Sequence, residues 1–147
     1  MPDSPGSVLF ACTQNAIRSP MAEALLKHFH GRRIFVDSAG VRAMEMDKLA
    51  IEVMAEIGID LNGHRAKTFD DLTDSSFDLV ITLSPEAHHR ALEMTRIMAC
   101  DVEYWPTQDA TVGEGSRESR LADYRAVRDT IKQRILARFP LSPGPSG

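Results

Sequence analysis

Residues 8–26, VLFACTQNAIRSPMAEALL, join a short apolar segment to an amphipathic one through a brief polar loop. Residues 8–11 are all apolar, which predicts a short buried strand. From residue 20 to residue 30 apolar side chains recur at helical spacing, so we expect a helix there, with Ser19 as its N-cap and Pro20 as its first residue. A strand that passes into a helix in this way is the first half of a parallel β-α-β unit.

The same alternation continues along the chain. Further strands are expected over residues 34–38, 77–83 and 101–105, and further helices over residues 47–57, 85–98 and 118–139. Four apolar strands alternating with amphipathic helices predict an α/β fold, in which helices cover both faces of a parallel sheet. Ligands bind such sheets at the carboxyl ends of the strands. The residues at that edge with polar or nucleophilic side chains are Cys12, Ser38, Ser84 and Asp109.

Length and composition limit the classes of protein to consider. With 147 residues, 43% hydrophobic and 26% charged, the chain is expected to form one globular domain over residues 1–147. Its Pro-, Gly- and Ser-rich ends, residues 1–6 and 140–147, are expected to be flexible tails. The net charge of −4 argues against a nucleic-acid partner.

The chain shows no sign of a membrane or extracellular setting. The N-terminal segment lacks a basic region, and the apolar run after it is too short for a signal peptide or a membrane span. The two cysteines, Cys12 and Cys100, do not make a disulfide scaffold, so we expect a cytoplasmic protein with free thiols. His88 and His89 are adjacent on a predicted helix and diverge by about 100°, which makes them poor metal ligands and predicts a solvated helix face. No metal or cofactor is expected.

The loop between Cys12 and Arg18 is a candidate oxyanion site. A helix start offers unpaired N–H groups and a positive dipole end, and Arg18 can hold two phosphate oxygens at once. The same field favours the thiolate form of Cys12, to which the hydroxyl of Ser19 can donate a hydrogen bond. However, a cysteine at the end of a strand is most often a buried packing residue, and the spacing Cys-x5-Arg alone is a weak signal.

Several blocks of the chain carry a family resemblance. Residues 12–24, CTQNAIRSPMAEA, resemble the signature loop of the low-molecular-weight protein-tyrosine-phosphatase superfamily, which includes the thioredoxin-coupled arsenate reductases. Further blocks resemble the family in the same order: DSAG (37–40), GIDLNGHRAKTFDDL (58–72), FDLVITL (77–83) and RAVRDTIKQRI (125–135). The resemblance spans residues 7–139. It implies a three-layer sandwich with a four-stranded parallel sheet in the order 2-1-3-4.

The resemblance implies a role for each matching residue. Cys12 would attack phosphorus to form a phosphocysteine, with Arg18 binding the oxyanion and Ser19 activating the thiolate. Asp109 would be the general acid, and Asp101 is the weaker candidate because it starts a strand at the opposite edge. The loop residues expected to bind or support the phosphate are Thr13, Gln14, Asn15, Ala16 and Ile17. Ser38 and His64 would hydrogen-bond Asn15, although His64 by itself reads as a solvated loop residue.

The chain also departs from the family pattern. Ala110 and Thr111 follow Asp109 where many relatives have proline and aromatic residues, and Ile17 replaces a second loop cysteine. Ser84 and Ala91 stand where the reductase branch has its other two cysteines, so its disulfide relay is absent. Cys100 is expected to be a small packing residue rather than a resolving thiol.

Three functions follow from this pattern. The first is hydrolysis of phosphotyrosine proteins or small aryl phosphates through a phosphocysteine intermediate, with inorganic phosphate as the loop ligand. The second is arsenate reduction with an external thiol such as glutathione. The third is a non-catalytic module that binds an oxyanion or a phosphoprotein.

Overall fold

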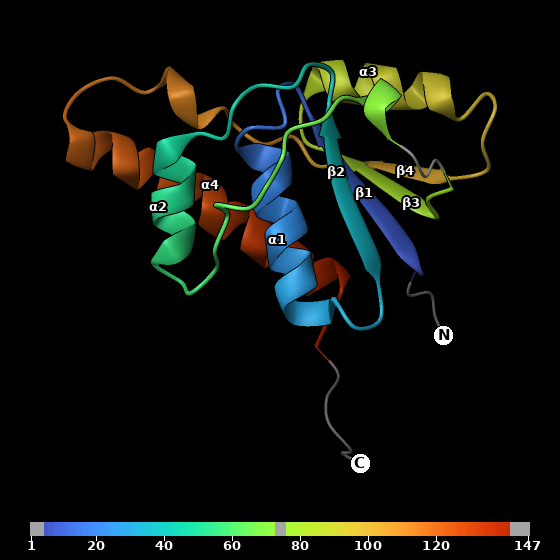
Figure 1. Ribbon diagram of the computed structural model, residues 1–147, viewed down its shortest axis with the longest axis horizontal. Coiled ribbons are helices and arrows are strands. Elements are labelled where there is room, and N and C mark those ends of the chain that lie inside the picture. Colours follow the sequence, from blue (N-terminus) through green and yellow to red (C-terminus); the bar gives the residue numbers. More distant parts are fainter. Residues whose placement is uncertain (1–4, 73–75, 142–147) are drawn as a thin grey trace, which may run out of the picture.

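The computed structural model describes residues 5–72 and 76–141, and its centre is a parallel sheet. The sheet has four strands in the order β2-β1-β3-β4, which confirms the expected α/β fold and strand order (Figure 1). The strands are β1 (Ser7–Cys12), β2 (Phe35–Gly40), β3 (Leu79–Thr82) and β4 (Asp101–Tyr104). In the central pairing, Cys12 lies opposite Gly40 and Ala11 lies opposite Thr82.

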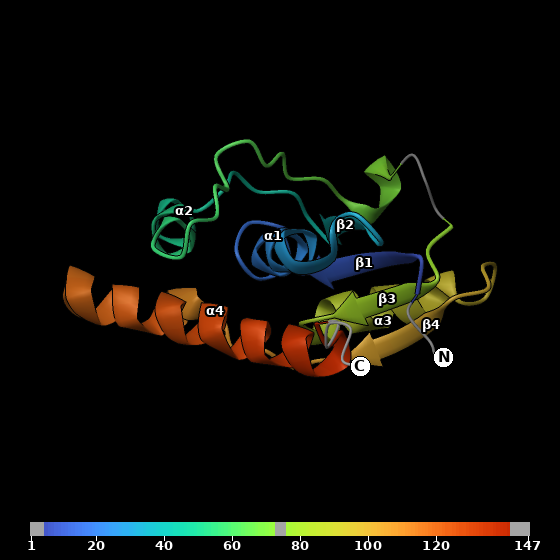
Figure 2. The same ribbon diagram turned by 90° about the horizontal axis from the view of Figure 1, so that it is seen from below.

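Helices cover both faces of this sheet (Figure 2). The helices are α1 (Arg18–His30), α2 (Lys48–Ala55), α3 (Pro85–Met94) and α4 (Arg117–Arg138). Because side chains alternate along a strand, Val8 and Phe10 of β1 pack with residues of α1, α2 and α4. Leu9 and Ala11 pack against α3 and the short 3₁₀ helix η1 (Phe69–Asp71) on the other face. The near-continuous apolar run of β1 is thus explained by burial on both sides.

The start of α1 differs from the sequence-based expectation. The helix begins at Arg18, and its N-cap is Ile17, which makes no side-chain capping hydrogen bond. Ser19 therefore lies inside the first turn and does not cap it, because its hydroxyl is used by the loop described below.

Other element ends also shift. β2 continues through Gly40, so Ser38 lies within the strand and not after it. α3 ends at Met94, four residues before the expected end, after which Thr95 forms its C-cap. α2 begins after Asp47, whose carboxylate accepts hydrogen bonds from Leu49 N and Ala50 N. The helix ends at Ala55, and Gly58, three residues further on, has the left-handed conformation with a φ of 80°.

The chain is fixed to the sheet from Gly6 onward. Gly6 N donates to Asp78 Oδ2 at 2.8 Å, and Gly6 O accepts from Phe35 N at 2.9 Å. Of the expected tails, residues 1–4 and 142–147 lie outside the described residues. Within the described part of the chain, no helix is long and apolar enough to cross a membrane.

Candidate active site

The loop of residues 13–17 connects the carboxyl end of β1 to α1 and encloses the thiol of Cys12. This side chain is buried, and its Sγ lies 2.9 Å from Ser19 Oγ. Asn15 N donates to the same sulfur at 3.3 Å. Asn15 has a φ of 53°, the left-handed conformation that asparagine tolerates better than most residues, and this conformation turns the loop back over the sulfur.

The side chain of Asn15 is fully buried and uses all of its hydrogen-bonding groups. Its Nδ2 donates to Ser19 Oγ at 2.9 Å and to Ser38 Oγ at 3.0 Å. Its Oδ1 accepts from Lys67 N at 2.9 Å and contacts His64 Nε2 at 3.1 Å. Ser38 and His64 both contact the side chain of Asn15. The backbone contact from Lys67 was not foreseen.

These contacts leave the hydroxyl hydrogen of Ser19 available to Cys12. Since both hydrogens of Asn15 Nδ2 are given to the two serine oxygens, Ser19 Oγ is an acceptor toward Asn15 and keeps its own hydrogen. That hydrogen can be donated to the Cys12 sulfur, which is the arrangement that a thiolate requires. Ser38 uses its hydrogen elsewhere, because its hydroxyl donates to Glu23 Oε1 at 2.5 Å.

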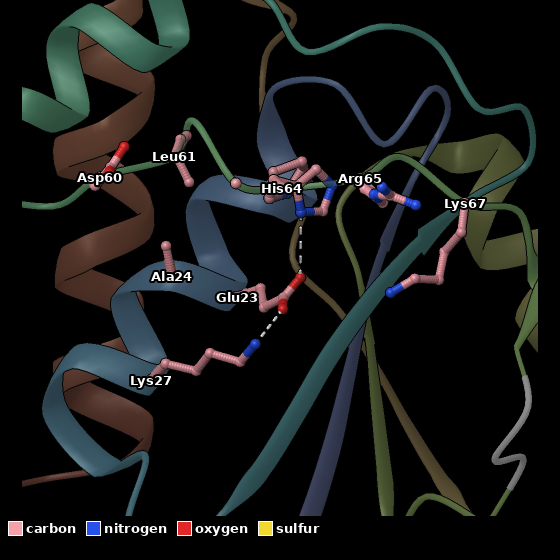
Figure 3. Close-up of a pocket in the computed structure, with 10 residues that line it drawn as sticks. Glu23, Ala24, Lys27, Asp60, Leu61, His64, Arg65 and Lys67 are labelled. Carbon is pink, nitrogen blue, oxygen red and sulfur yellow. Dashed lines mark hydrogen bonds and ion pairs between the residues drawn. The ribbon is translucent and has the colours of Figure 1, made fainter.

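Glu23 lies behind the loop, in a pocket of about 380 Å³ between α1 and residues 60–67 (Figure 3). Its carboxylate is buried. Glu23 Oε2 lies 2.5 Å from Lys27 Nζ, and Glu23 Oε1 lies 3.7 Å from His64 Nδ1. Burial lowers the pKa of His64, an effect that the charge of Glu23 opposes and that of Lys67 reinforces. Sequence reasoning missed both Glu23 and Lys67. The one available signal for Glu23 was an acidic residue within the apolar first turns of α1.

The segment after β2 packs on the back of the loop, main chain against main chain. The N–H groups of Val41, Arg42 and Met44 donate to the carbonyls of Cys12, Thr13 and Gln14 at 3.1, 2.8 and 3.0 Å. Gly40 permits this approach, because a Cβ at that position would lie 2.7 Å from Asn15 N and would also collide with the carbonyl oxygen of Arg42. The loop is therefore supported by backbone contacts along most of its length.

Arg18 and Asp109 lie close enough for the guanidinium charge to lower the pKa of the carboxyl group. Arg18 Nη1 donates to Thr107 O at 2.9 Å, which anchors the guanidinium and leaves its other N–H groups for a ligand. Asp109 Oδ1 accepts from Thr111 N at 2.9 Å and from Thr111 Oγ1 at 2.7 Å, and so caps the 3₁₀ helix η2 (Ala110–Val112). Burial raises the pKa of Asp109, but the two hydrogen bonds from Thr111 and the charge of Arg18 outweigh it, and the pKa lies below its ordinary value.

Comparison with known proteins agrees with this geometry. The family model described as low molecular weight phosphotyrosine protein phosphatase matches residues 7–139. The chain belongs to this family. The match covers the loop, Ser38, His64 and Asp109, and its extent is the one that the sequence resemblance predicted.

Relatives of the chain carry several activities in their names. An arsenate reductase of Halalkalibacterium halodurans is 35% identical over 130 residues, which are 87% of this chain and 91% of that protein. A solved protein tyrosine phosphatase is 28% identical with a TM-score of 0.67, covering 92% of this chain and 97% of its own. The YwlE arginine phosphatase from Geobacillus stearothermophilus is 27% identical with a TM-score of 0.70, covering 89% of this chain and 88% of its own.

The phosphatase-family loop of this chain has no second thiol beside it at the positions that the sequence singled out. Ser84 lies next to the loop, where its Oγ accepts from Thr13 Oγ1 at 3.0 Å while it caps α3. Ala91 is buried within α3, and Ile17 is buried in the loop itself. Cys12 and Cys100 are both free.

Cys100 lies in a different environment from Cys12. It is partly buried just before β4, and it packs on the α3 side of the sheet with Leu9 and Val80. Burial, with the nearby charge of Asp101, raises the pKa of the Cys100 thiol. Asp101 itself begins β4, at the opposite end of that strand from Asp109.

The prediction of a solvated face at His88 and His89 is wrong for His88. His88 is half-buried, its Nδ1 lies 3.0 Å from Thr82 Oγ1, and its ring stacks on Tyr104 at 4.6 Å between ring centres. His89 is exposed. Over residues 5–72 and 76–141 there is no group of three or more His, Cys, Asp or Glu side chains able to hold a metal ion.

Proposed function

We propose that this chain is a cysteine-dependent phosphatase that hydrolyses phosphotyrosine or aryl phosphate monoesters through a phosphocysteine at Cys12. The observation that carries the proposal is the hydrogen-bond series from the Cys12 sulfur through Ser19 to the fully buried Asn15. It leaves a hydroxyl hydrogen available for donation to the sulfur, which a buried packing cysteine would not require.

In the first step, the loop N–H groups and Arg18 would hold the phosphoryl oxygens while the Cys12 thiolate attacks phosphorus in line. The P–S bond forms as the bond from phosphorus to the leaving oxygen breaks. Asp109 would give its proton to that oxygen. This requires Asp109 to be protonated, and the negative charge of a bound phosphoryl group would raise its pKa toward that state.

In the second step, the Asp109 carboxylate would take a proton from water. The water oxygen attacks phosphorus, the P–S bond breaks, and inorganic phosphate and the Cys12 thiolate are released. The resting position of Asp109, as an ionised cap on Thr111 beside Arg18, suits this role as a base.

Arsenate reduction with an external thiol such as glutathione is the second candidate, because the arsenate reductase relative is 35% identical over most of the chain. The loop would bind arsenate as it binds phosphate. Ser84 and Ala91 supply no thiol, so a small thiol from solution would have to attack the Cys12 sulfur of the Cys12–arsenic adduct. The S–As bond would break to release arsenite as a mixed disulfide forms between Cys12 and the small thiol, and a second small thiol would reduce that disulfide to restore Cys12.

One set of assays separates these possibilities. Wild type, Cys12→Ser and the control Cys100→Ser are compared on p-nitrophenyl phosphate, a phosphotyrosine peptide, a phosphoarginine peptide, and arsenate with glutathione. We expect hydrolysis of the two aryl phosphates by wild type and Cys100→Ser, none by Cys12→Ser, and a phosphocysteine trapped by rapid acid quench and mass spectrometry. A preference for phosphoarginine would overturn the aryl substrate class, and thiol-dependent arsenite formation without hydrolysis would favour the second candidate.

A further inference from the structure

We propose that Arg134 and Thr107 form a positioning bridge that fixes Arg18 and the Asp109 loop relative to each other. Arg134 belongs to α4, far along the chain from both groups, and it does not touch the loop around Cys12. The role assigned to it rests on the proposed function of Arg18 and Asp109.

Thr107 is a buried residue whose polar groups are all in use. Its N–H donates to Leu83 O at 3.2 Å, which ties it to the end of β3. Its hydroxyl donates to Trp105 O at 2.8 Å and accepts from Arg134 Nη1 at 3.2 Å. Its carbonyl accepts from Arg18 Nη1 at 2.9 Å. The orientation of the Arg18 guanidinium thus depends on the orientation of one peptide group.

Arg134 stabilises that peptide group from the side of α4. Its Nη1 donates to Pro106 O at 2.7 Å as well as to Thr107 Oγ1, so one charged nitrogen gives both hydrogens to adjacent residues of the same loop. Within the described residues Arg134 has no carboxylate partner, whereas the next arginine of this helix, Arg138, pairs with Glu103. Hydrogen bonds from a charged donor to neutral carbonyls are stronger than ordinary ones.

The helix that presents Arg134 is itself rigidly placed. Ile131 and Ile135 on either side of it are fully buried in the core between the sheet and the helices. Two residues beyond Thr107 the chain reaches Asp109, which lies close enough to Arg18 for its pKa to respond to the guanidinium charge. A shift of residues 106–107 would therefore displace both Arg18, which would bind the oxyanion, and Asp109, which would act as the acid.

The bridge is tested with Arg134→Ala, Arg134→Lys, Thr107→Val and Thr107→Ser. Lysine can still donate to the carbonyl of Pro106, and serine keeps the hydroxyl, so these two are the conservative rescues. Arg125→Ala is the matched control, since Arg125 lies on the same helix but pairs with Glu56. Displacing a catalytic group by about 1 Å can cost on the order of 100-fold in rate, so we expect Arg134→Ala and Thr107→Val to lower kcat by about 10- to 100-fold.

Two readouts distinguish positioning from a purely structural role. The loss of kcat should be larger for phenyl phosphate than for p-nitrophenyl phosphate, because a poor leaving group depends more on a well-placed acid. Inorganic phosphate should also bind about 10-fold more weakly, as followed by the fluorescence of Trp105, the only tryptophan of the chain. Arg134→Lys and Thr107→Ser should recover part of both effects, and Arg125→Ala should show neither.

The binding readout does not depend on turnover. If the wild type hydrolyses no substrate, the proposed function fails while the phosphate titration still tests the bridge. If Arg134→Ala lowers only the melting temperature, with an unchanged leaving-group dependence and an unchanged phosphate affinity, the bridge is overturned.

Discussion

Asn15 Oδ1 accepts the backbone N–H of Lys67 at 2.9 Å, across 52 positions of the sequence. In the same segment, residues 64–68, His64 Nε2 also contacts Asn15 Oδ1, and Lys67 O accepts a hydrogen bond from Gly40 N at 2.9 Å. The loop around Cys12 is thus held by β2 and by residues 64–68 as well as by its own turn. Its geometry depends on contacts made far from it in sequence.

Replacing Asn15 separates the two roles of this residue, which are its backbone conformation and its side-chain hydrogen bonds. Asn15→Ala should lower kcat by at least about 10-fold and the free energy of unfolding by about 1–3 kcal/mol, because buried partners lose their hydrogen bonds. Asn15→Gly should lose as much activity but be more stable than Asn15→Ala, since glycine adopts a φ of 53° without strain. Urea unfolding and steady-state kinetics measure both, and a glycine variant with wild-type kcat would contradict the role of the side chain.

Thr111 should affect the pH at which kcat/KM begins to fall as the pH rises. If Asp109 must be protonated for the first step, kcat/KM falls as the pH rises through its pKa. Thr111→Val removes a hydroxyl that lowers this pKa, so the pKa rises and the falling limb should move to higher pH. Thr111→Ser keeps the hydroxyl and should retain the wild-type profile. A falling limb that stays in place in the valine variant would show that another group sets it.

Glu56 should make the stability of the fold depend on pH. Hydrogen bonds from the Arg125 side chain, with those from Arg128, hold the pKa of Glu56 at about 2 in place of 4.5, although partial desolvation opposes the shift. Because the folded pKa is depressed, this stabilisation is complete above about 4.5 and is lost as the pH falls toward about 2. Urea midpoints across that window should fall less steeply in Glu56→Gln than in wild type. Glu114→Gln, at an exposed position, is the control that should keep the wild-type slope.

Tyr124 should stabilise the contact between α4 and the start of α2. Its hydroxyl donates to Asp47 Oδ2 at 2.9 Å, and burial with this hydrogen bond raises the pKa of Tyr124 to about 12, so the donor stays protonated. Tyr124→Phe should cost about 1.5–3 kcal/mol in the free energy of unfolding, as expected for a hydrogen bond to a charged acceptor. Asp47→Asn keeps an acceptor without the charge and should cost less. Equal unfolding energies for wild type and Tyr124→Phe would show that the contact contributes nothing.

The parallel sheet was predictable from local pattern, whereas the strand order and the role of the loop were expected from the family resemblance. The apolar run of β1 is buried on both faces, so it stands out from the residues around it, and the alternation with helical periodicity fixes a parallel sheet. Asn15 in the left-handed conformation could also be expected from its residue type.

The other features of the site depend on long-range contacts. Ser19 before Pro20 has the pattern of an N-cap, but its hydroxyl contacts Cys12 and Asn15, and the helix begins two residues earlier than expected, at Arg18. Lys67 acts through its backbone N–H, which leaves no trace in residue type. The environment of His88, on α3, was misjudged because its partner Tyr104 lies on a different element, the strand β4.

Gly40 has a consequence for how this site can vary. Since residues 41–44, which follow β2, meet the loop through main-chain hydrogen bonds, the form of the loop is set by peptide groups and by the side chain of Asn15, and not by the identity of the side chains at residues 14, 16 and 17. Shape and side-chain chemistry are therefore separable in this part of the molecule. The support of the loop around Cys12 therefore does not require a thiol at position 17, where this chain has Ile17.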